Sequence, residues 1–399
     1  MNEGFATWVG WLAVDYLYPE WDIWSKFTSE SLQTALTMDS LKGSHAIEVE
    51  VTHALEIDQI FDAISYMKGS SCIRMLSNHL GVQTFLKGVS DYLKKHAYGN
   101  ATTEDLWNAL SLASGLSVRG NMDLWIKDVG YPVITVAEEM DGIGIEQSRF
   151  LSTGNGLLIT KLNAGDATEA DQKLWWIPLG LKTENTPTHQ LVNVLDKQKS
   201  ITVQPIDLAF YKLNDSASGV YRVNYPPTRL EAFGKQIATG HKLLNASDRI
   251  SLVADAAALA ISGEGSTSAF LSLAQNFTHE SNYFVWDELL KRLSQLQNAW
   301  YEQPQKVMDG LRALSMSLVS EKYAEIGWDA KPGEDYLTLQ LRPALIKEAH
   351  FAKIPGYTKQ QDFANVVSKK KLVSAFKLGL TVTKPLFHLI SAVWCSASF

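Results

Sequence analysis

Histidine side chains are the first residues to consider for chemistry in this sequence, because they bind metal ions and transfer protons near neutral pH. The chain has nine histidines, and none belongs to an H-E-x-x-H motif. His45 and His53 lie close together on a segment expected to be extended, so they form a weak pair of candidate metal ligands. All nine are expected to be surface or packing residues. The sequence also contains no G-x-x-x-x-G-K-[ST] phosphate loop and no G-x-S-x-G nucleophile elbow.

Cysteine chemistry is limited to two residues, Cys72 and Cys395. Two cysteines cannot form a disulfide framework or a cysteine metal site. Cys72 has Lys68 and Arg74 near it in sequence, but it belongs to an apolar helical pattern. We therefore predict that Cys72 is an inert packing residue.

Glu3 is the carboxylate whose position raises a question. It precedes apolar residues at helical spacing, which predicts an amphipathic helix with a buried face made by Phe5, Trp8, Val9, Leu12 and Tyr16. An acidic residue is favoured in the first turn of a helix, because the free N–H groups there carry partial positive charge. Spacing alone therefore predicts a structural role for Glu3.

Composition bounds the class of protein. A chain of 399 residues is long for one core, so two or three domains are expected. The 46% hydrophobic content and 12 tryptophans favour large packed cores. A formal charge of -7 gives no basic field for nucleic acid or an anionic membrane. No secretory signal follows Met1 and residues 385–399 are too short and polar to span a bilayer, so we expect a cytoplasmic protein without membrane insertion.

Helical patterns dominate residues 2–129. Pro19 is expected to open the second helix, with Trp21, Trp24 and Phe27 on its inner side. Thr102 and Asp105 are spaced as a capping box. Between helices, residues 44–53 alternate in polarity, which predicts a short strand or an extended arm.

The sequence period changes near Gly130, which can end a helix, and Pro132, which prevents its continuation. The segments that follow alternate as strands do, and they predict a small β-sandwich: VITVAEEM, KLWWIPLGL, QLVNVLD, SITVQ, FYKLN and GVYRVNY. Helical spacing returns after residue 226, with Ser247 as the expected N-cap of one helix and Gly263 near its end. Antiparallel helix pairs or a short α-solenoid are expected there.

Several stretches, in order over about residues 2–345, resemble the M1 family of zinc aminopeptidases, and the puromycin-sensitive and fungal cytosolic members most. They are NEGFATW, HALEIDQIFDAISYMKGSSCIRML, YGNATTEDLWNALSLASG, MDLWIKDVGYPVITV, SGVYRVNYPP and ASDRISLVADAAALA. The resemblance implies an α+β multidomain fold. Its parts would be the end of a thermolysin-like helical subdomain (1–130), a β-sandwich (131–226), a solenoid-like helical domain (227–350) and a divergent tail (351–399).

The resemblance also implies roles for two residues. Glu3, in NEGFA, matches the family's third zinc ligand, whose partners are the two histidines of H-E-x-x-H. Tyr66, in DAISYMKG, matches the tyrosine whose phenol stabilises the oxyanion, a contribution of about 2.7–4 kcal/mol in such sites. Lys68 is expected to be a solvated or structural charge. Ala46 stands where the family commonly has proline, which is expected to affect loop stiffness only.

The family's N-terminal β-domain, its G-A-M-E-N stretch and its H-E-x-x-H helix have no counterpart in this sequence. We therefore expect the downstream part of an aminopeptidase, which cleaves peptides in full-length members with one zinc ion per site. This chain alone is expected to retain no zinc and to be inactive, since loss of even indirect ligand support costs about 10–100-fold in affinity. A separately made N-terminal half is one possible partner. The alternative is a non-catalytic module that binds peptides or proteins.

Overall fold

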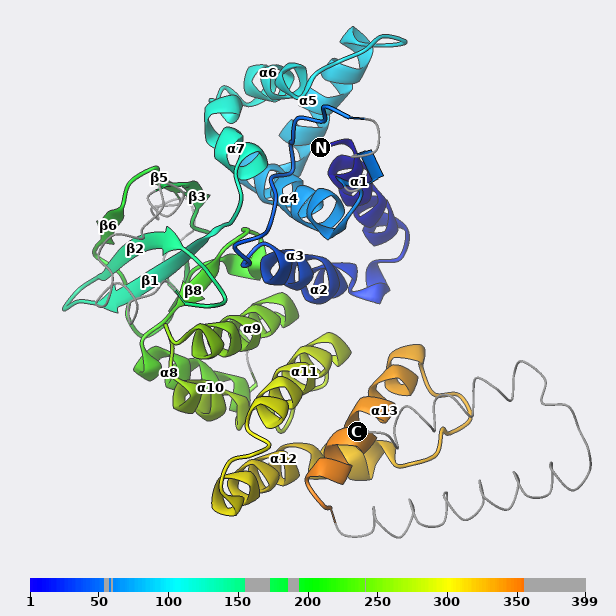
Figure 1. Ribbon diagram of the computed structural model, residues 1–399, viewed down its shortest axis with the longest axis vertical. Coiled ribbons are helices and arrows are strands. Elements are labelled where there is room, and N and C mark those ends of the chain that lie inside the picture. The colour runs from blue at the N-terminus through cyan, green and yellow to red at the C-terminus, as the bar shows by residue number, and fades with distance from the viewer. Residues whose placement is uncertain (54–56, 59, 155–172, 186–193, 241, 355–399) are drawn as a thin grey trace, which may run out of the picture.

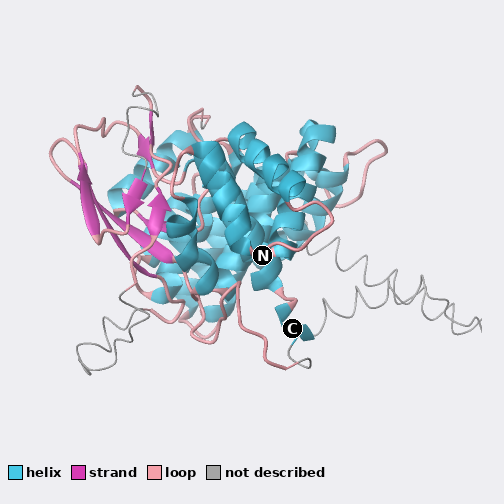
Figure 2. Cartoon of the chain, turned by 90° about the horizontal axis from the view of Figure 1, so that it is seen from above, coloured by secondary structure: helices cyan, strands magenta, loops and turns pink. Residues whose placement is uncertain are grey.

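A computed structural model describes residues 1–53, 57–58, 60–154, 173–185, 194–240 and 242–354. The chain forms helices first, then short strands, then helices again (Figure 1). Viewed from above, the strands lie at one side of the molecule and helices fill the rest (Figure 2). The α+β class expected from the sequence is therefore confirmed. The tail expected at 351–399 lies outside the described residues except for 351–354.

The first helical region is built from short elements. They are α1 (Asn2–Leu17), the 3-10 turn η1 (Pro19–Trp21), α2 (Ile23–Phe27), the π-helical turn η2 (Thr28–Leu32), α3 (Gln33–Met38), the π-helical turn η4 (Ile64–Lys68), α4 (Gly69–Leu80), α5 (Val82–Lys95), α6 (Thr103–Ser114) and α7 (Val118–Lys127). The predicted capping box is confirmed: the Thr102 side chain accepts from the Asp105 amide, and Asp105 accepts from the Thr102 amide. This box fixes where α6 begins.

Two expectations for this region are wrong. Pro19 opens only a 3-10 turn, and Trp21 is half exposed while Phe27 is fully buried. In α1, Trp8 is buried as predicted, but Val9 is exposed and Tyr16 is 86% exposed. Helical spacing predicted one continuous apolar face, whereas the neighbouring helices cover only part of it.

The segment of residues 44–53 is an extended arm and contains no strand within its described length. The Glu48 amide donates to the Ile126 carbonyl of α7 at 2.8 Å, and Ile47 is buried. Of the alternating residues Ile47, Val49 and Val51, only Ile47 is buried, and the strand alternative was wrong.

The strands form one larger sheet, in the order β6-β2-β1-β8, and two small pairs, β3-β5 and β4-β7. Their bounds are β1 (Pro132–Glu138), β2 (Ile143–Arg149), β3 (Trp176–Pro178), β4 (Lys182–Thr183), β5 (Val194–Asp196), β6 (Ser200–Val203), β7 (Tyr211–Lys212) and β8 (Arg222–Asn224). Strand β1 pairs antiparallel with β2, where Val136 faces Ile145, and parallel with β8, where Ile134 faces Val223.

Each predicted strand segment contains a strand, but the sequence prediction missed β2 and the short strand β4. The inward residues of β2 are Ile143, Ile145, Gln147 and Arg149, so half of its buried positions are polar. Gln147 is buried because its amide is matched: it donates to the Trp175 carbonyl at 2.9 Å and accepts from the Trp175 amide at 2.9 Å. Tertiary hydrogen bonds thus allow polar residues to be buried in β2, and the strand lacks the regular apolar alternation on which the prediction relied.

The last helices are α8 (Pro227–Ala238), α9 (Ala246–Ser262), α10 (Thr267–Ala274), α11 (Tyr283–Ala299), α12 (Gln305–Ile326) and α13 (Tyr336–Phe351). Gly263 ends α9 in the left-handed conformation, as predicted. The N-cap of α9 is Asn245 rather than Ser247, in a capping box with Asp248. No helix in the described ranges is long and apolar enough to cross a membrane.

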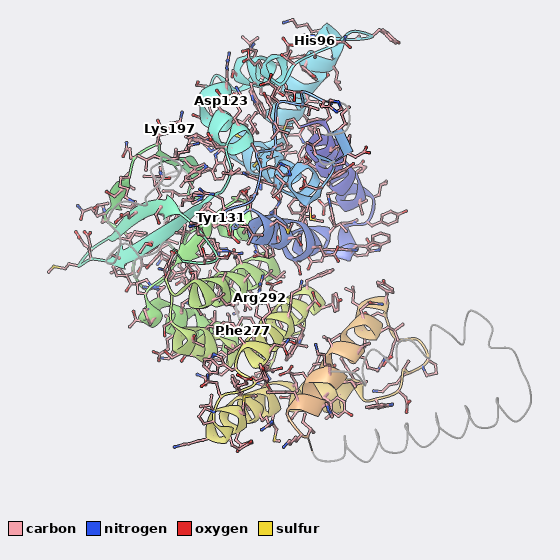
Figure 3. The ribbon with its side chains drawn as sticks, in the orientation of Figure 1. His96, Asp123, Tyr131, Lys197, Phe277 and Arg292 are labelled. Carbon is pink, nitrogen blue, oxygen red and sulfur yellow. The ribbon has the colours of Figure 1, made fainter. Side chains whose placement is uncertain are left out.

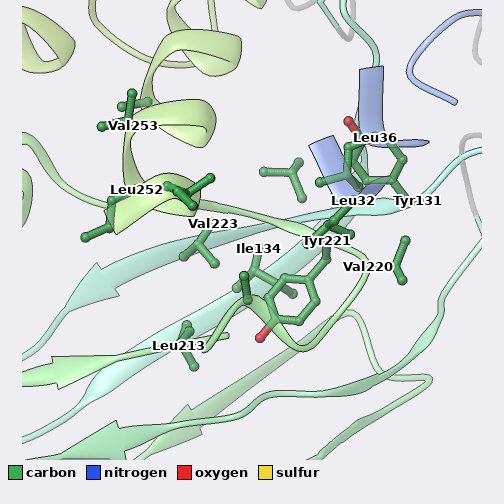
Figure 4. Packing of buried hydrophobic residues seen from close by; sticks show 14 of the residues in the cluster. Leu32, Leu36, Tyr131, Ile134, Leu213, Val220, Tyr221, Val223, Leu252 and Val253 are labelled. Atoms are coloured by element: carbon green, nitrogen blue, oxygen red, sulfur yellow. The ribbon is translucent and has the colours of Figure 1, made fainter. Parts of the chain in front are cut away.

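Buried residues from all three parts of the chain meet in one core. Figure 4 shows Leu36 of α3, Ile134 of β1 and Leu252 of α9 around the same junction. Arg222 of β8 is 1% exposed there, and it donates to the carboxylate of Asp255 in α9 at 2.8 Å and to the Tyr131 hydroxyl at 3.1 Å. This junction joins the sheet to both helical regions.

Candidate functional site

Glu3 and Tyr66, the two residues with expected catalytic roles, lie together in the structure. Glu3 is in the first turn of α1, and Tyr66 is at the middle of the π-helical turn η4. Partial desolvation raises the pKa of Tyr66, and the nearby Glu3 carboxylate raises it further. A neutral donor and a carboxylate therefore meet at one point on the surface.

Two glycines bring these residues together. Gly4, directly after Glu3, lies against the backbone of Gly69, the first residue of α4. A Cβ atom on Gly4 would lie 2.5 Å from the carbonyl carbon and 2.6 Å from the Cα of Gly69. The two helices touch backbone to backbone at this point, so glycine is required for the approach that sets Glu3 beside Tyr66.

We predict that Gly4→Ala lowers the free energy of unfolding by about 1–3 kcal/mol, because the new methyl group must push two helices apart. Backbone atoms of Gly69 and Ser70 lie within 2.8 Å of that methyl position, so no side chain can move aside to relieve the clash. Denaturant unfolding followed by circular dichroism would measure the change.

Gly10 of α1 provides the matched control, since a Cβ there would have nothing within 4 Å. Gly10→Ala should raise the stability by about 0.5–1 kcal/mol, because glycine is a poor helix former. Equal effects of the two substitutions would contradict the close contact at Gly4.

A buried ion pair holds the end of η4. The Lys68 ammonium lies 2.8 Å from the Asp39 carboxylate, and the two side chains are 0% and 1% exposed. Lys68 also donates to the carbonyls of Asp128 and Gly130, each at 3.2 Å. Of the two roles expected for Lys68, the structural one is correct and the solvated one is wrong.

Asp62 holds the beginning of η4. One oxygen of its carboxylate accepts from the amides of Ile64 at 2.9 Å and Ser65 at 3.2 Å. The other oxygen lies 2.8 Å from Nε2 of His45, whose Nδ1 lies 2.7 Å from the Ala46 carbonyl. Both ring nitrogens of His45 are thus engaged, so His45 does not act as a metal ligand in this arrangement.

The described residues contain no group of three or more His, Cys, Asp or Glu side chains that could hold a metal ion. Among these residues, Glu3 therefore lacks the two partners with which it could form a metal site of three ligands.

Cys72 is a buried free thiol in α4, as predicted. Burial raises its pKa to about 12, and the nearby Lys68 lowers it only in part. The thiolate that reacts with electrophiles is therefore scarce at neutral pH, which makes Cys72 inert. Cys395 lies outside the described residues.

Sequence reasoning missed the residues that position Tyr66. Asp62 carried a usable signal, because aspartate just before a helical run is a common cap. Gly4 and Gly69 carried a weaker one, since each directly follows a residue of interest and interrupts a helical pattern. His45 was considered as a weak metal ligand and as a surface or packing residue, and no local signal pairs it with Asp62.

Two family models match separate parts of the chain. Residues 1–125 match the peptidase family M1 domain, and residues 210–369 match the ERAP1-like C-terminal domain. The α+β fold is thus that of part of a peptidase, in the class of hydrolases. Together the two matches support a fragment of an M1 family protein.

Curated relatives agree with this assignment. The chain is 43% identical to Aminopeptidase 2 of Candida albicans, over 89% of this chain and 37% of that protein. It is 40% identical to "Aminopeptidase 2, mitochondrial" of Saccharomyces cerevisiae, over 88% of this chain and 35% of that protein. Aminopeptidase M1 of Arabidopsis thaliana is 36% identical, over 86% of this chain and 39% of its own length. The chain therefore spans little more than a third of the length of these relatives.

Proposed function

We propose that this chain supplies part of the active site of a zinc aminopeptidase, with Glu3 as a zinc ligand and Tyr66 as the donor to the oxyanion. The proximity of Tyr66 and Glu3 carries the proposal, because it places a candidate ligand and a neutral donor beside each other. The names of the relatives, which include Alanine/arginine aminopeptidase of Saccharomyces cerevisiae, support removal of N-terminal residues from peptides as the reaction.

The residues of this chain fit a zinc ion only in part. Hydrolytic zinc sites take three protein ligands and leave one position for water or substrate. Glu3 offers one carboxylate, and the part of the chain that the structure describes brings no two further ligands to it. Because the sequence contains no H-E-x-x-H motif, the proposal takes both remaining ligands from outside these 399 residues.

The proposed role of Tyr66 follows from its chemistry. A bound zinc ion would activate water and polarise the peptide carbonyl. Tyr66 would donate its phenolic hydrogen to the oxygen that gains negative charge, and such donors contribute most when they are held in place in advance. The Gly4–Gly69 contact and the two anchors of η4 supply that rigidity.

The order of elements supports the division into a helical part (1–130), a β-sandwich (131–226) and a solenoid-like helical part (227–350), which we retain as a proposal. We propose a reducing, cytoplasmic setting because Cys72 is a free thiol. The name of the Saccharomyces relative, which includes "mitochondrial", gives the alternative that cell fractionation would reveal.

Zinc content and peptidase activity test the proposed function together. The purified chain would be assayed alone and with a polypeptide from a relative that carries an H-E-x-x-H motif. We expect well under one zinc ion per chain alone, and about one ion with hydrolysis of alanyl or arginyl arylamides in the assembly. In the assembly, Glu3→Ala should lower zinc affinity by about 100-fold or more. Tyr66→Phe should keep the zinc and lower kcat by about 10²–10³-fold.

The two substitutions separate a ligand from a donor, because only the first should change the zinc content. Stoichiometric zinc on the chain alone would overturn the incomplete site. A Tyr66→Phe assembly with full kcat would overturn the role of the phenol. An assembly that binds no zinc would favour a non-catalytic binding module.

A further inference from the structure

His45 makes two hydrogen bonds that together define its charge. Its Nδ1 faces the backbone carbonyl of Ala46 at 2.7 Å, and its Nε2 faces a carboxylate oxygen of Asp62 at 2.8 Å. A carbonyl and an ionised carboxylate only accept hydrogen bonds, so both ring nitrogens must carry hydrogen. The geometry therefore selects the imidazolium form of His45.

Asp62 is the link between His45 and η4. Its Oδ2 is held by His45, which leaves Oδ1 to accept from the amides of Ile64 and Ser65. The backbone carbonyl of Asp62 also accepts from the amide of Tyr66 at 3.1 Å. One residue thus fixes three consecutive amides of the turn that carries the phenol.

We propose that His45 is a positioning residue for Tyr66, and that its imidazolium orients Asp62 so that this carboxylate caps the π-helical turn. The proposal rests on the proposed function only for the importance of Tyr66. Free N–H groups at the start of a helical turn otherwise need water or another acceptor. A π-helical turn is less common than an α-helix and is often found at functional sites, so a dedicated anchor is physically reasonable.

Because Asp62 is oriented by the charged form of His45, the capping of η4 should be sensitive to pH. Partial desolvation lowers the pKa of His45, but the bonds to Ala46 and Asp62 and the charge of Asp39 outweigh it, so the pKa is raised. Because the folded pKa exceeds the unfolded one, the stabilisation is fully present below about pH 6.5. It is lost as pH rises through the folded value.

Amide hydrogen exchange of the 399-residue chain tests the proposal without substrate or metal. Mass spectrometry of the peptide covering residues 61–68 would give protection factors, corrected for intrinsic exchange, at about pH 6 and about pH 8.5. We expect wild-type protection to fall several-fold between these values. His45→Gln should lower protection by about tenfold at the lower pH and remove the pH dependence.

His45→Arg distinguishes charge from shape. Guanidinium stays charged at both pH values and has donors for both acceptors, so it should restore protection at about pH 6 and keep it at about pH 8.5. The control is His96→Gln. His96 lies at the outer end of α5 (Figure 3), and its Nε2 is 3.9 Å from a carboxylate oxygen of Asp105. Its loss should leave the protection of residues 61–68 unchanged. Asp62→Asn, which weakens the pair from the other side, should also remove the pH dependence.

Unchanged protection in His45→Gln at both pH values would overturn the proposal. Equal loss in the glutamine and arginine variants would also overturn it, because shape rather than charge would then hold Asp62. Failure of the proposed function shows elsewhere, as full kcat in the Tyr66→Phe assembly, and leaves these exchange results standing.

Discussion

Asp255→Ala is expected to lower the free energy of unfolding by about 3–5 kcal/mol, because it leaves a buried guanidinium without its counter-charge. Arg222 is 1% exposed, and its ion pair with Asp255 is 2.8 Å long. The second oxygen of Asp255 accepts from the Val223 amide at 3.1 Å, so the substitution also removes the partner of a buried donor. Denaturant unfolding of the purified variant would measure the loss.

The size of this effect follows from the place of the pair in the fold. Arg222 also donates to the Gln33 side chain at 3.1 Å and to the Tyr131 hydroxyl. These neutral acceptors remain in Asp255→Ala, but neither can balance the charge. The sheet, α3 and α9 meet at this one side chain, so the loss should weaken the junction of all three parts of the chain.

An exposed pair in α8 serves as the control for Asp255→Ala. Lys235 and Glu231 are 72% and 57% exposed, and Glu231→Ala should change stability by under about 1 kcal/mol. The double variant Arg222→Met with Asp255→Leu should be more stable than Asp255→Ala alone, since it leaves no lone charge. A loss below about 1 kcal/mol in Asp255→Ala would show that the guanidinium finds other compensation.

Lys68→Met is the second substitution for which we expect a loss of about 3–5 kcal/mol. Methionine keeps most of the length of the side chain, but it removes the ammonium that lies 2.8 Å from Asp39. Asp39 would keep its bonds from the Gly130 amide at 3.0 Å and the Ser44 hydroxyl at 2.8 Å. Its charge would nevertheless remain buried and unpaired, which is the costly outcome. Thermal and denaturant unfolding would both report it.

The same substitution should loosen the segment between α7 and β1. Lys68 donates to the carbonyls of Asp128 and Gly130 in that segment, so its loss frees two backbone groups as well as a charge. We expect faster proteolytic cleavage near residues 128–130 in Lys68→Met than in wild type. Cleavage at the wild-type rate would argue against this second effect.

Lys87→Met is the matched control, because Lys87 pairs with Asp91 at 3.2 Å on an exposed face of α5. Its effect on stability should stay under about 1 kcal/mol. Adding Asp39→Asn to Lys68→Met should recover part of the loss, since the remaining amide carries no charge. A Lys68→Met chain as stable as the Lys87→Met control would refute the buried pair.

Features that depend on short stretches of chain could be read from the sequence. The capping box at Thr102 and Asp105, the end of α9 at Gly263 and the change of period near Gly130 are read correctly from neighbouring residues. Backbone preferences and caps act over a few residues, so the sequence states them directly. The family assignment rests on the same kind of information, short motifs in a fixed order.

Tertiary packing, in contrast, sets which of these residues meet and which charges are buried. Tyr66 reaches Glu3 because two glycines let α1 and α4 touch, and Lys68 is buried because Asp39 of another segment lies opposite it. His45, considered as a metal ligand on the sequence, proved to be the partner of Asp62. The sequence prediction missed β2 because half of its buried residues are polar. The environment of a polar side chain is the sum of contributions from segments that are distant in sequence, and packing alone brings those segments together.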